Sequence, residues 1–131
     1  MKAVKGEEII LTMENKVGAL EVIAKLVTDA GINLRGISAY VIDNKAMFRI
    51  IASDNAKAKD ILKKAGTIQT KEVIIVDVPD EIGQLQVLAT KLKDAGIDLT
   101  HIYGTTSKPH QSAIIVFASN NNNKALEVIA S

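Results

Sequence analysis

The chain has 131 residues, with 16 Lys and Arg against 15 Asp and Glu, and no cysteine. This length suits one domain or two small ones, and such a body buries about two-thirds of its unfolded surface, which is enough for a core without disulfides. Because the chain has no cysteine, disulfides, iron–sulfur clusters and a thiol nucleophile are excluded. Positive and negative residues are interspersed along the sequence, so it shows no basic patch of the kind found in nucleic-acid-binding proteins.

The first elements along the chain are a strand and a helix. Residues 7–13, EEIILTM, form a short apolar run that predicts a strand. The segment ENKVG then turns, and Asn15 is expected to cap the helix that follows. Apolar residues recur at helical spacing over about 17–30, and Gly31 is expected to end this helix because glycine adopts the left-handed conformation without a Cβ penalty.

The next segment predicts two strands joined by a tight turn at DNK, then a capped helix and another strand. The expected ranges are 32–42 and 46–52 for the two strands, 55–65 for the helix and 67–78 for the last strand. Ser53 or Asp54 is placed to cap the helix, and Gly66 is placed to stop it.

The second half of the chain repeats the first. DAGINL begins at residue 29 and DAGIDL at residue 94, a shift of 65, and residues 17–34 align with 82–99 at the same shift. The chain is therefore interpreted as a tandem duplication of a β-α-β-β-α-β unit. The predicted fold class is α+β: two ferredoxin-like modules, each an antiparallel sheet with its helices on one face, packed by a pseudo-twofold axis.

The predicted modules cover residues 1–71 and 72–131. The second copy reaches its last residue directly after its second helix and so lacks a fourth strand of its own. The segment equivalent to the closing strand of the first copy is residues 2–6, KAVKG. We hypothesise that this segment pairs as the fourth strand of the second module, because an unpaired edge invites aggregation. The alternative is a frayed terminus.

Both copies resemble the ACT domain, on the strength of ENKVGAL followed by DAGINL and PDEIGQL followed by DAGIDL. The resemblance covers essentially the whole chain and is closest to stand-alone proteins made of two ACT modules. It departs from the family where Val17 and Ile82 occupy a place that often holds proline. It implies a non-catalytic regulatory protein that binds an amino acid or similar ligand at an interface between modules, without a cofactor. It also implies a homodimer and an enzyme of amino-acid metabolism as a partner.

In ACT domains the turn before the first helix, together with the start of the second strand of the partner module, holds the ligand. Carried over by position, the resemblance implicates Asn15, Val17, Gly18, Ala19, Leu20, Ile37, Ser38 and Ala39 in the first copy, and Asp80, Ile82, Gly83, Gln84, Leu85, Ile102, Tyr103 and Gly104 in the second. Physical chemistry supports the turns as sites, because a helix N-terminus favours a carboxylate and glycine permits close approach.

The charges of the two turns differ. Asp80 and Glu81 add two negative charges where Asn15 and Lys16 have no net negative charge. A carboxylate is therefore expected to prefer the first turn, while Asp80 serves an ammonium group or caps its helix.

Two other kinds of function remain as alternatives. One is a structural or dimerisation scaffold, or a regulatory subunit, that binds no ligand. The other is an enzyme on the same framework, such as an acyl-phosphate hydrolase, which needs an arginine-rich anion loop that neither turn contains. His101 and His110 lack the spacing of metal ligands, so we predict no metal site and no catalytic residues. No apolar run approaches the ~20 residues of a membrane span and no signal peptide is evident, so we expect a cytoplasmic protein.

Overall fold

The computed structural model describes residues 1–106 and 108–130. It divides the chain into two compact units, each described here by itself. The first unit is Glu7–Lys71, and the second unit is Met1–Gly6 together with Glu72–Ser131. Two long strands, β1 (Lys2–Glu14) and β4 (Thr67–Pro79), contribute residues to both units.

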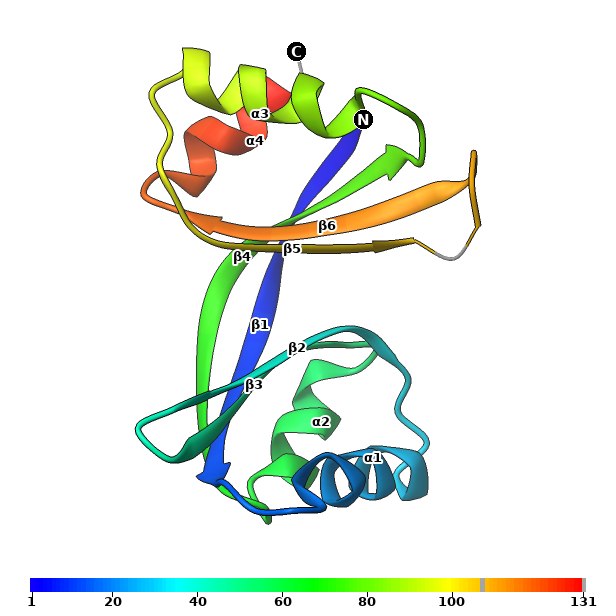
Figure 1. The fold of residues 1–131 in the computed structure, drawn as a ribbon, viewed down its shortest axis with the longest axis vertical. Helices are drawn as coiled ribbons and strands as arrows, with labels where there is room; N and C mark the ends of the chain where they lie inside the picture. The colour runs from blue at the N-terminus through cyan, green and yellow to red at the C-terminus, as the bar shows by residue number, and fades with distance from the viewer. Residues whose placement is uncertain (107, 131) are drawn as a thin grey trace. The chain divides into compact units, whose positions relative to one another are not determined.

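The first unit holds four strands and two helices in the order expected from the sequence. Besides its parts of β1 and β4, its elements are α1 (Ala19–Asp29), β2 (Leu34–Ile42), β3 (Lys45–Ala52) and α2 (Asn55–Leu62). The strand order is β2-β3-β1-β4, and β3 pairs antiparallel with both β1 and β2. The two helices lie together on one face of these strands (Figure 1).

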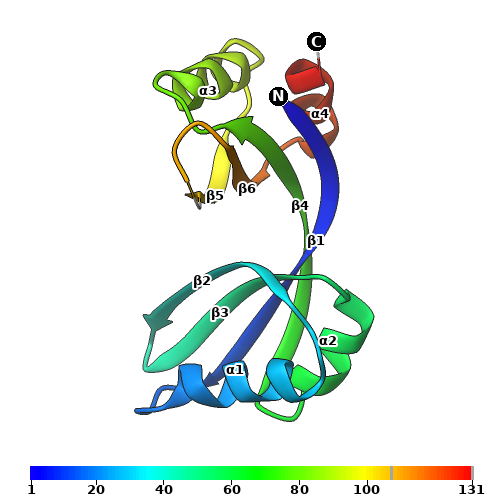
Figure 2. The ribbon, with the colours of Figure 1, turned by 90° about the vertical axis from the view of Figure 1, so that its right-hand side faces the viewer.

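The second unit repeats this arrangement. Besides its parts of β1 and β4, its elements are α3 (Gln84–Asp94), β5 (Leu99–Thr106), β6 (Ser112–Ser119) and α4 (Asn122–Ala130). The strand order is β1-β4-β6-β5, so that β1 lies at one edge beside β4. Figure 2 shows α3 and α4 on the same face of this sheet. The predicted α+β class, with two ferredoxin-like modules, is confirmed.

Each unit has its own apolar core between its sheet and its helices. In the first unit Ile23 of α1 and Leu62 of α2 pack against alternate residues of the sheet, including Leu11 and Phe48. In the second unit Leu88 of α3 belongs to the equivalent cluster, which is made of the residues Ile74, Val76, Val78, Leu88, Leu92, Ile97, Ile115, Phe117, Ala125 and Ile129. Alternate residues of each strand and one face of each helix are apolar. These side chains therefore meet in one core per unit.

The second helix of each unit is fixed by asparagine and aspartate side chains. Asp54 caps α2, as predicted, by accepting a hydrogen bond from the Lys57 N–H at 3.0 Å. Asn122 opens α4 and donates from Nδ2 to the Glu72 carbonyl at 3.2 Å, just as Asn55 donates to the Glu7 carbonyl at 2.8 Å in the first unit. The run of asparagines before α4 is thus used for anchoring this helix to its sheet.

One buried ion pair distinguishes the first unit from the second. Glu8 is only 1% exposed, and its Oε1 accepts a hydrogen bond from Nη1 of Arg49 at 2.7 Å. Arg49 also donates from Nε to the Tyr40 hydroxyl at 2.7 Å. Burial disfavours the charged guanidinium, but the hydrogen bonds to Tyr40 and Glu8 and the charge of Glu8 outweigh it, so the pKa of Arg49 is raised above its ordinary value.

These three side chains lie on the sheet face opposite to α1 and α2, because Glu8 and Arg49 alternate with the core residues Ile9 and Ile50. The repeat places Val73 and Val116 at the equivalent positions of the second unit, since Arg49 pairs with Ile10 and Val116 pairs with Ile75. Across residues 1–106 and 108–130, no helix is both long enough and apolar enough to cross a bilayer.

Candidate functional site

The two helix-start turns have nearly the same backbone. Gly18 and Gly83 are the N-cap residues of α1 and α3, both with φ of 89°, and no side chain caps either helix. The prediction that Asn15 caps the first helix is therefore wrong. A Cβ atom on either glycine would meet nothing within 4 Å, so glycine is needed here for its left-handed backbone and not for close approach of another group.

A pocket lies beside the second of these turns. It has a volume of about 450 Å³ and belongs entirely to the second unit. Its lining residues are Asp80, Leu85, Ile102, Tyr103, Gly104, Thr105, Thr106, Ala113, Ile114 and Ile115. The structure thus brings together five residues that the family resemblance had implicated: Asp80, Leu85, Ile102, Tyr103 and Gly104.

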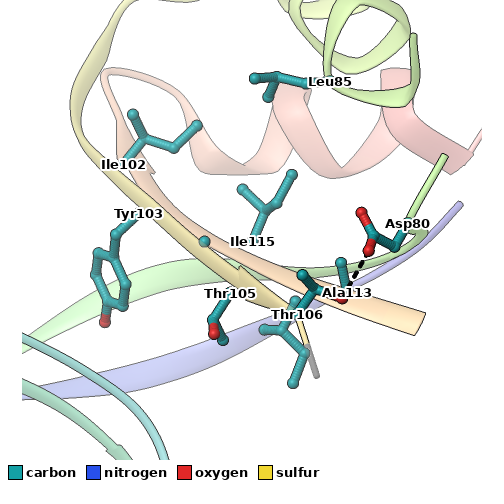
Figure 3. A pocket seen from close by; sticks show the side chains of 10 residues that line it. Asp80, Leu85, Ile102, Tyr103, Thr105, Thr106, Ala113 and Ile115 are labelled. Atoms are coloured by element: carbon teal, nitrogen blue, oxygen red, sulfur yellow. Dashed lines mark hydrogen bonds between the residues drawn. The ribbon is translucent and has the colours of Figure 1, made fainter. Parts of the chain in front are cut away.

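The walls of this pocket are apolar. Figure 3 shows Leu85 of α3 and the side chains of Ile102 and Ile115 directed into the space between helix and sheet. Tyr103 and Thr105 alternate with them along β5, and their side chains point to the opposite face of the sheet (Figure 3). A ligand on the helix side would therefore meet the backbone of Tyr103 and Thr105 and the side chains of the isoleucines.

Asp80 supplies the charge of the pocket. Its Oδ2 accepts a hydrogen bond from the Thr106 hydroxyl at 3.0 Å, so Asp80 ties the turn to the end of β5 and does not cap α3 (Figure 3). Its backbone N–H donates to the Gln111 carbonyl at 2.7 Å, and its carbonyl accepts from the His110 N–H at 3.0 Å. One side-chain hydrogen bond to the end of β5 and two backbone hydrogen bonds to the β5–β6 connection hold this half-buried residue in place.

The remaining predicted residues of the second copy lie outside the lining. Ile82 is entirely exposed in the turn, Gly83 is the N-cap, and Gln84 is the first residue of α3. None of the three lines the pocket.

The predicted residues of the first copy occupy the equivalent turn and strand. Val17 is entirely exposed, Asn15 and Gly18 are exposed, and Ala19 is buried in the core of its unit. Leu20 and Ile37 are also exposed, at 58% and 41%. Ser38 and Ala39 follow Ile37 along β2, and Ser38 pairs with Arg49 on the face opposite to the helices. Of this set, Leu20 on α1 is exposed, as are Ile37 and Ala39 on the helix-facing side of β2.

Five of the ten lining residues of the pocket were not predicted from the sequence. Thr105 and Thr106 continue β5, and Ala113, Ile114 and Ile115 belong to β6, which pairs with β5. The signal available for the residues of β6 was the continuous apolar run in SAIIVFAS, which predicts a strand but not which strand lies beside it. Among the described residues, no group of three His, Cys, Asp or Glu side chains is placed to hold a metal ion.

Comparison with known protein families identifies the family of this chain. The sequence profile of the ACT domain pair family matches residues 5–131. The chain belongs to this family. No curated protein sequence matches the ACT domain pair described here.

Several solved structures share its fold. Protein BT0572 from Bacteroides thetaiotaomicron is 23% identical, with a TM-score of 0.88 over 98% of this chain and 88% of that one. The regulatory subunit of aspartate kinase from Thermus thermophilus is 11% identical, with a TM-score of 0.71 over 99% and 95% of the two chains. The aspartokinase alpha and beta subunits are 17% identical, with a TM-score of 0.67 over 98% and 95%. At these identities the likeness concerns the fold.

Proposed function

We propose that this ACT domain pair is a non-catalytic regulatory protein that binds an amino acid or similar small molecule in the pocket beside Asp80. The observation that carries the proposal is the pocket itself, in which one fixed carboxylate faces apolar walls at the start of a helix. Such a concave apolar site with few polar groups is typical of small-molecule binding. The aspartate kinase regulatory subunit, which shares the fold, supports the regulatory part by analogy.

The chemistry of the pocket fits a zwitterion. Asp80 offers its carboxylate to an ammonium group, and its bond to Thr106 fixes the direction of that charge. The start of α3 has no side-chain cap, and although the Gln84 N–H donates to the Glu81 carbonyl, the positive end of the helix dipole favours a carboxylate there. Leu85 and Ile102 then cover an aliphatic part of the ligand.

A thermal-shift screen against the twenty amino acids tests the proposal. At least one amino acid is expected to raise the melting temperature, because a ligand that binds only the folded state stabilises it by mass action. Asp80→Asn should then weaken that ligand at least about tenfold, since a hydrogen bond to a charged group contributes about 1.5–3 kcal/mol. Asn15→Ala, in the other turn, is the matched control and should leave the affinity unchanged.

A screen in which no amino acid shifts the melting temperature would contradict the ligand and favour the scaffold alternative. An equal loss in the Asp80 variant and in the control would show that the ligand binds elsewhere. Regulation requires that the ligand prefers one state of a partner complex over another. We propose an enzyme of amino-acid metabolism as that partner, and its activity should respond to the bound amino acid only when the ACT domain pair is present.

We also propose that the ACT domain pair is a homodimer. In the first unit the edge strand β2 is bordered by exposed apolar side chains, with Leu20 at 58%, Ile37 at 41% and Val41 at 55% exposure. Unpaired strand edges of this kind associate with a second chain unless they are blocked. Val41→Lys is expected to convert a dimer to a monomer in sedimentation velocity, and a wild-type monomer would contradict this.

A further inference from the structure

The two units differ at one pair of facing residues on the helix side of the sheet. In the first unit Ala39 pairs with Phe48, and in the second unit Gly104 pairs with Ile115. The two pairs occupy the same place in the repeat, because Phe48 pairs onward with Leu11 and Ile115 pairs onward with Val76. Leu11 and Val76 are themselves 65 positions apart.

Glycine at position 104 is not needed for a turn. Its φ lies outside the left-handed region, so its backbone conformation does not require glycine. An added Cβ would lie 3.2 Å from the Ile114 carbonyl oxygen and 3.3 Å from Cγ1 of Ile115, so these neighbours would have to shift by a few tenths of an ångström to admit it. In the first unit that place is taken by the Ala39 methyl group.

The aromatic ring of each unit is also placed differently. Phe48 lies opposite Leu11. Phe117 lies opposite Ile74, which is two residues further from the helix-start turn than Val76, the equivalent of Leu11. Both rings are buried in the cores of their units. In the second unit the phenylalanine ring therefore lies further from the helix-start turn, and the smaller Ile115 lies beneath the pocket.

The apolar side chains at the rims of the two positions are equally exposed. Leu20 and Leu85 are 58% and 60% exposed, and Ile37 and Ile102 are both 41% exposed. The two positions differ in charge, because Asn15 stands in the first unit where the second has Asp80, and in the residues below, which are Ala39 and Phe48 in the first unit and Gly104 and Ile115 in the second.

We propose that each chain binds one ligand, in the second unit, and that Gly104 and Ile115, together with Asp80, are the residues that restrict binding to this unit. The inference rests on the proposed ligand-binding function and adds its stoichiometry and its specificity-determining residues. It also assigns the class of ligand, one with an ammonium group and a branched aliphatic group, because Asp80 is the charged lining residue and the rest of the wall near Gly104 is apolar. This differs from the expectation drawn from the turn charges alone, which favoured the first turn.

Methyl NMR with 3-methylbutylamine as the probe tests the inference in the full chain. The amine carries the cation and the branched aliphatic group without requiring knowledge of the natural ligand. With labelled isoleucine methyl groups, Ile102 and Ile115 should shift with one saturable affinity, while Ile37 stays unchanged. Equal shifts at Ile102 and Ile37 would overturn the inference and leave the binding function standing.

Two variants exchange the floors of the units. Gly104→Ala should weaken the amine about tenfold or more, because one extra methyl group in an apolar pocket has an effect of this size. Ala39→Gly with Phe48→Ile and Asn15→Asp, which supplies the equivalent of Asp80, should create a second site, seen as a new saturable shift at Ile37. If Gly104→Ala binds the amine as wild type does, or if the amine shifts neither unit, the inference is overturned. The amino-acid screen then decides separately whether the proposed function also fails.

Discussion

The buried pair of Glu8 and Arg49 allows a stability prediction with a control inside the same chain. Arg49→Val removes the partner of a carboxylate that is 1% exposed and whose hydrogen bond is 2.7 Å long. Removing one member of a buried ion pair costs about 3–5 kcal/mol, because the other charge stays buried and loses its ion-pair partner. We expect a loss of this size in the first unit.

The double variant Glu8→Val with Arg49→Val reproduces the residues that the second unit already has at these positions, Val73 and Val116. Replacing a buried ion pair by apolar residues is often neutral or stabilising by about 1–4 kcal/mol. The double variant should therefore be at least as stable as the wild type, although it carries one more substitution than the single variant.

Fluorine NMR during urea unfolding measures the two units separately. The chain has two phenylalanines, Phe48 in the first unit and Phe117 in the second, so 4-fluorophenylalanine gives one buried probe per unit. Arg49→Val should lower the midpoint at Phe48 by more than about 1 M, given slopes of about 1–3 kcal/mol per molar urea. A loss below about 1 kcal/mol, or a double variant as unstable as the single one, would refute the reasoning.

Three further variants address the frame of the molecule. Gly66→Ala should destabilise the first unit by more than about 2 kcal/mol, because its Cβ would clash with the Thr12 carbonyl oxygen and overpacking is costly; a Phe48 midpoint equal to wild type would contradict this. Asp54→Ala should cost about 0.5–2 kcal/mol through the lost cap on α2, read from the same probe, with no effect at Phe117. Deleting residues 2–6 should lower the midpoint at Phe117 first, and in the intact chain hydrogen exchange should protect the amides of Ala3 and Val4 like those of the core strands. Rapid exchange of those two amides would exclude a paired strand there.

The sequence predicted the architecture because the signals for it are local and occur twice. Helical spacing ending at Gly31 and its repeat, together with the alternation of the strands, was sufficient for the element order and the fold class. The cap of the first helix was missed because Gly18, with its positive φ, and not Asn15 forms the N-cap.

The pocket was predictable only in part. The turn and β5 were found through the resemblance, but the depth of the pocket depends on Ile115, which reaches it through strand pairing and not through sequence proximity. The burial of Glu8 was also invisible, because a glutamate at the start of an apolar run normally marks a solvent-exposed strand end.

The division of β1 between the two units has a consequence for how the protein is made. During translation the first unit is complete once Lys71 has left the ribosome, but residues 1–6 are then still without the strand beside which they belong. In the second unit β4 lies beside β1, so residues 1–6 lack this neighbour until the part of β4 that follows Lys71 has also been made. Until then the nascent chain carries an open β-edge, and the charges of Lys2 and Lys5 on this edge are of the kind that keeps such edges from associating with other chains.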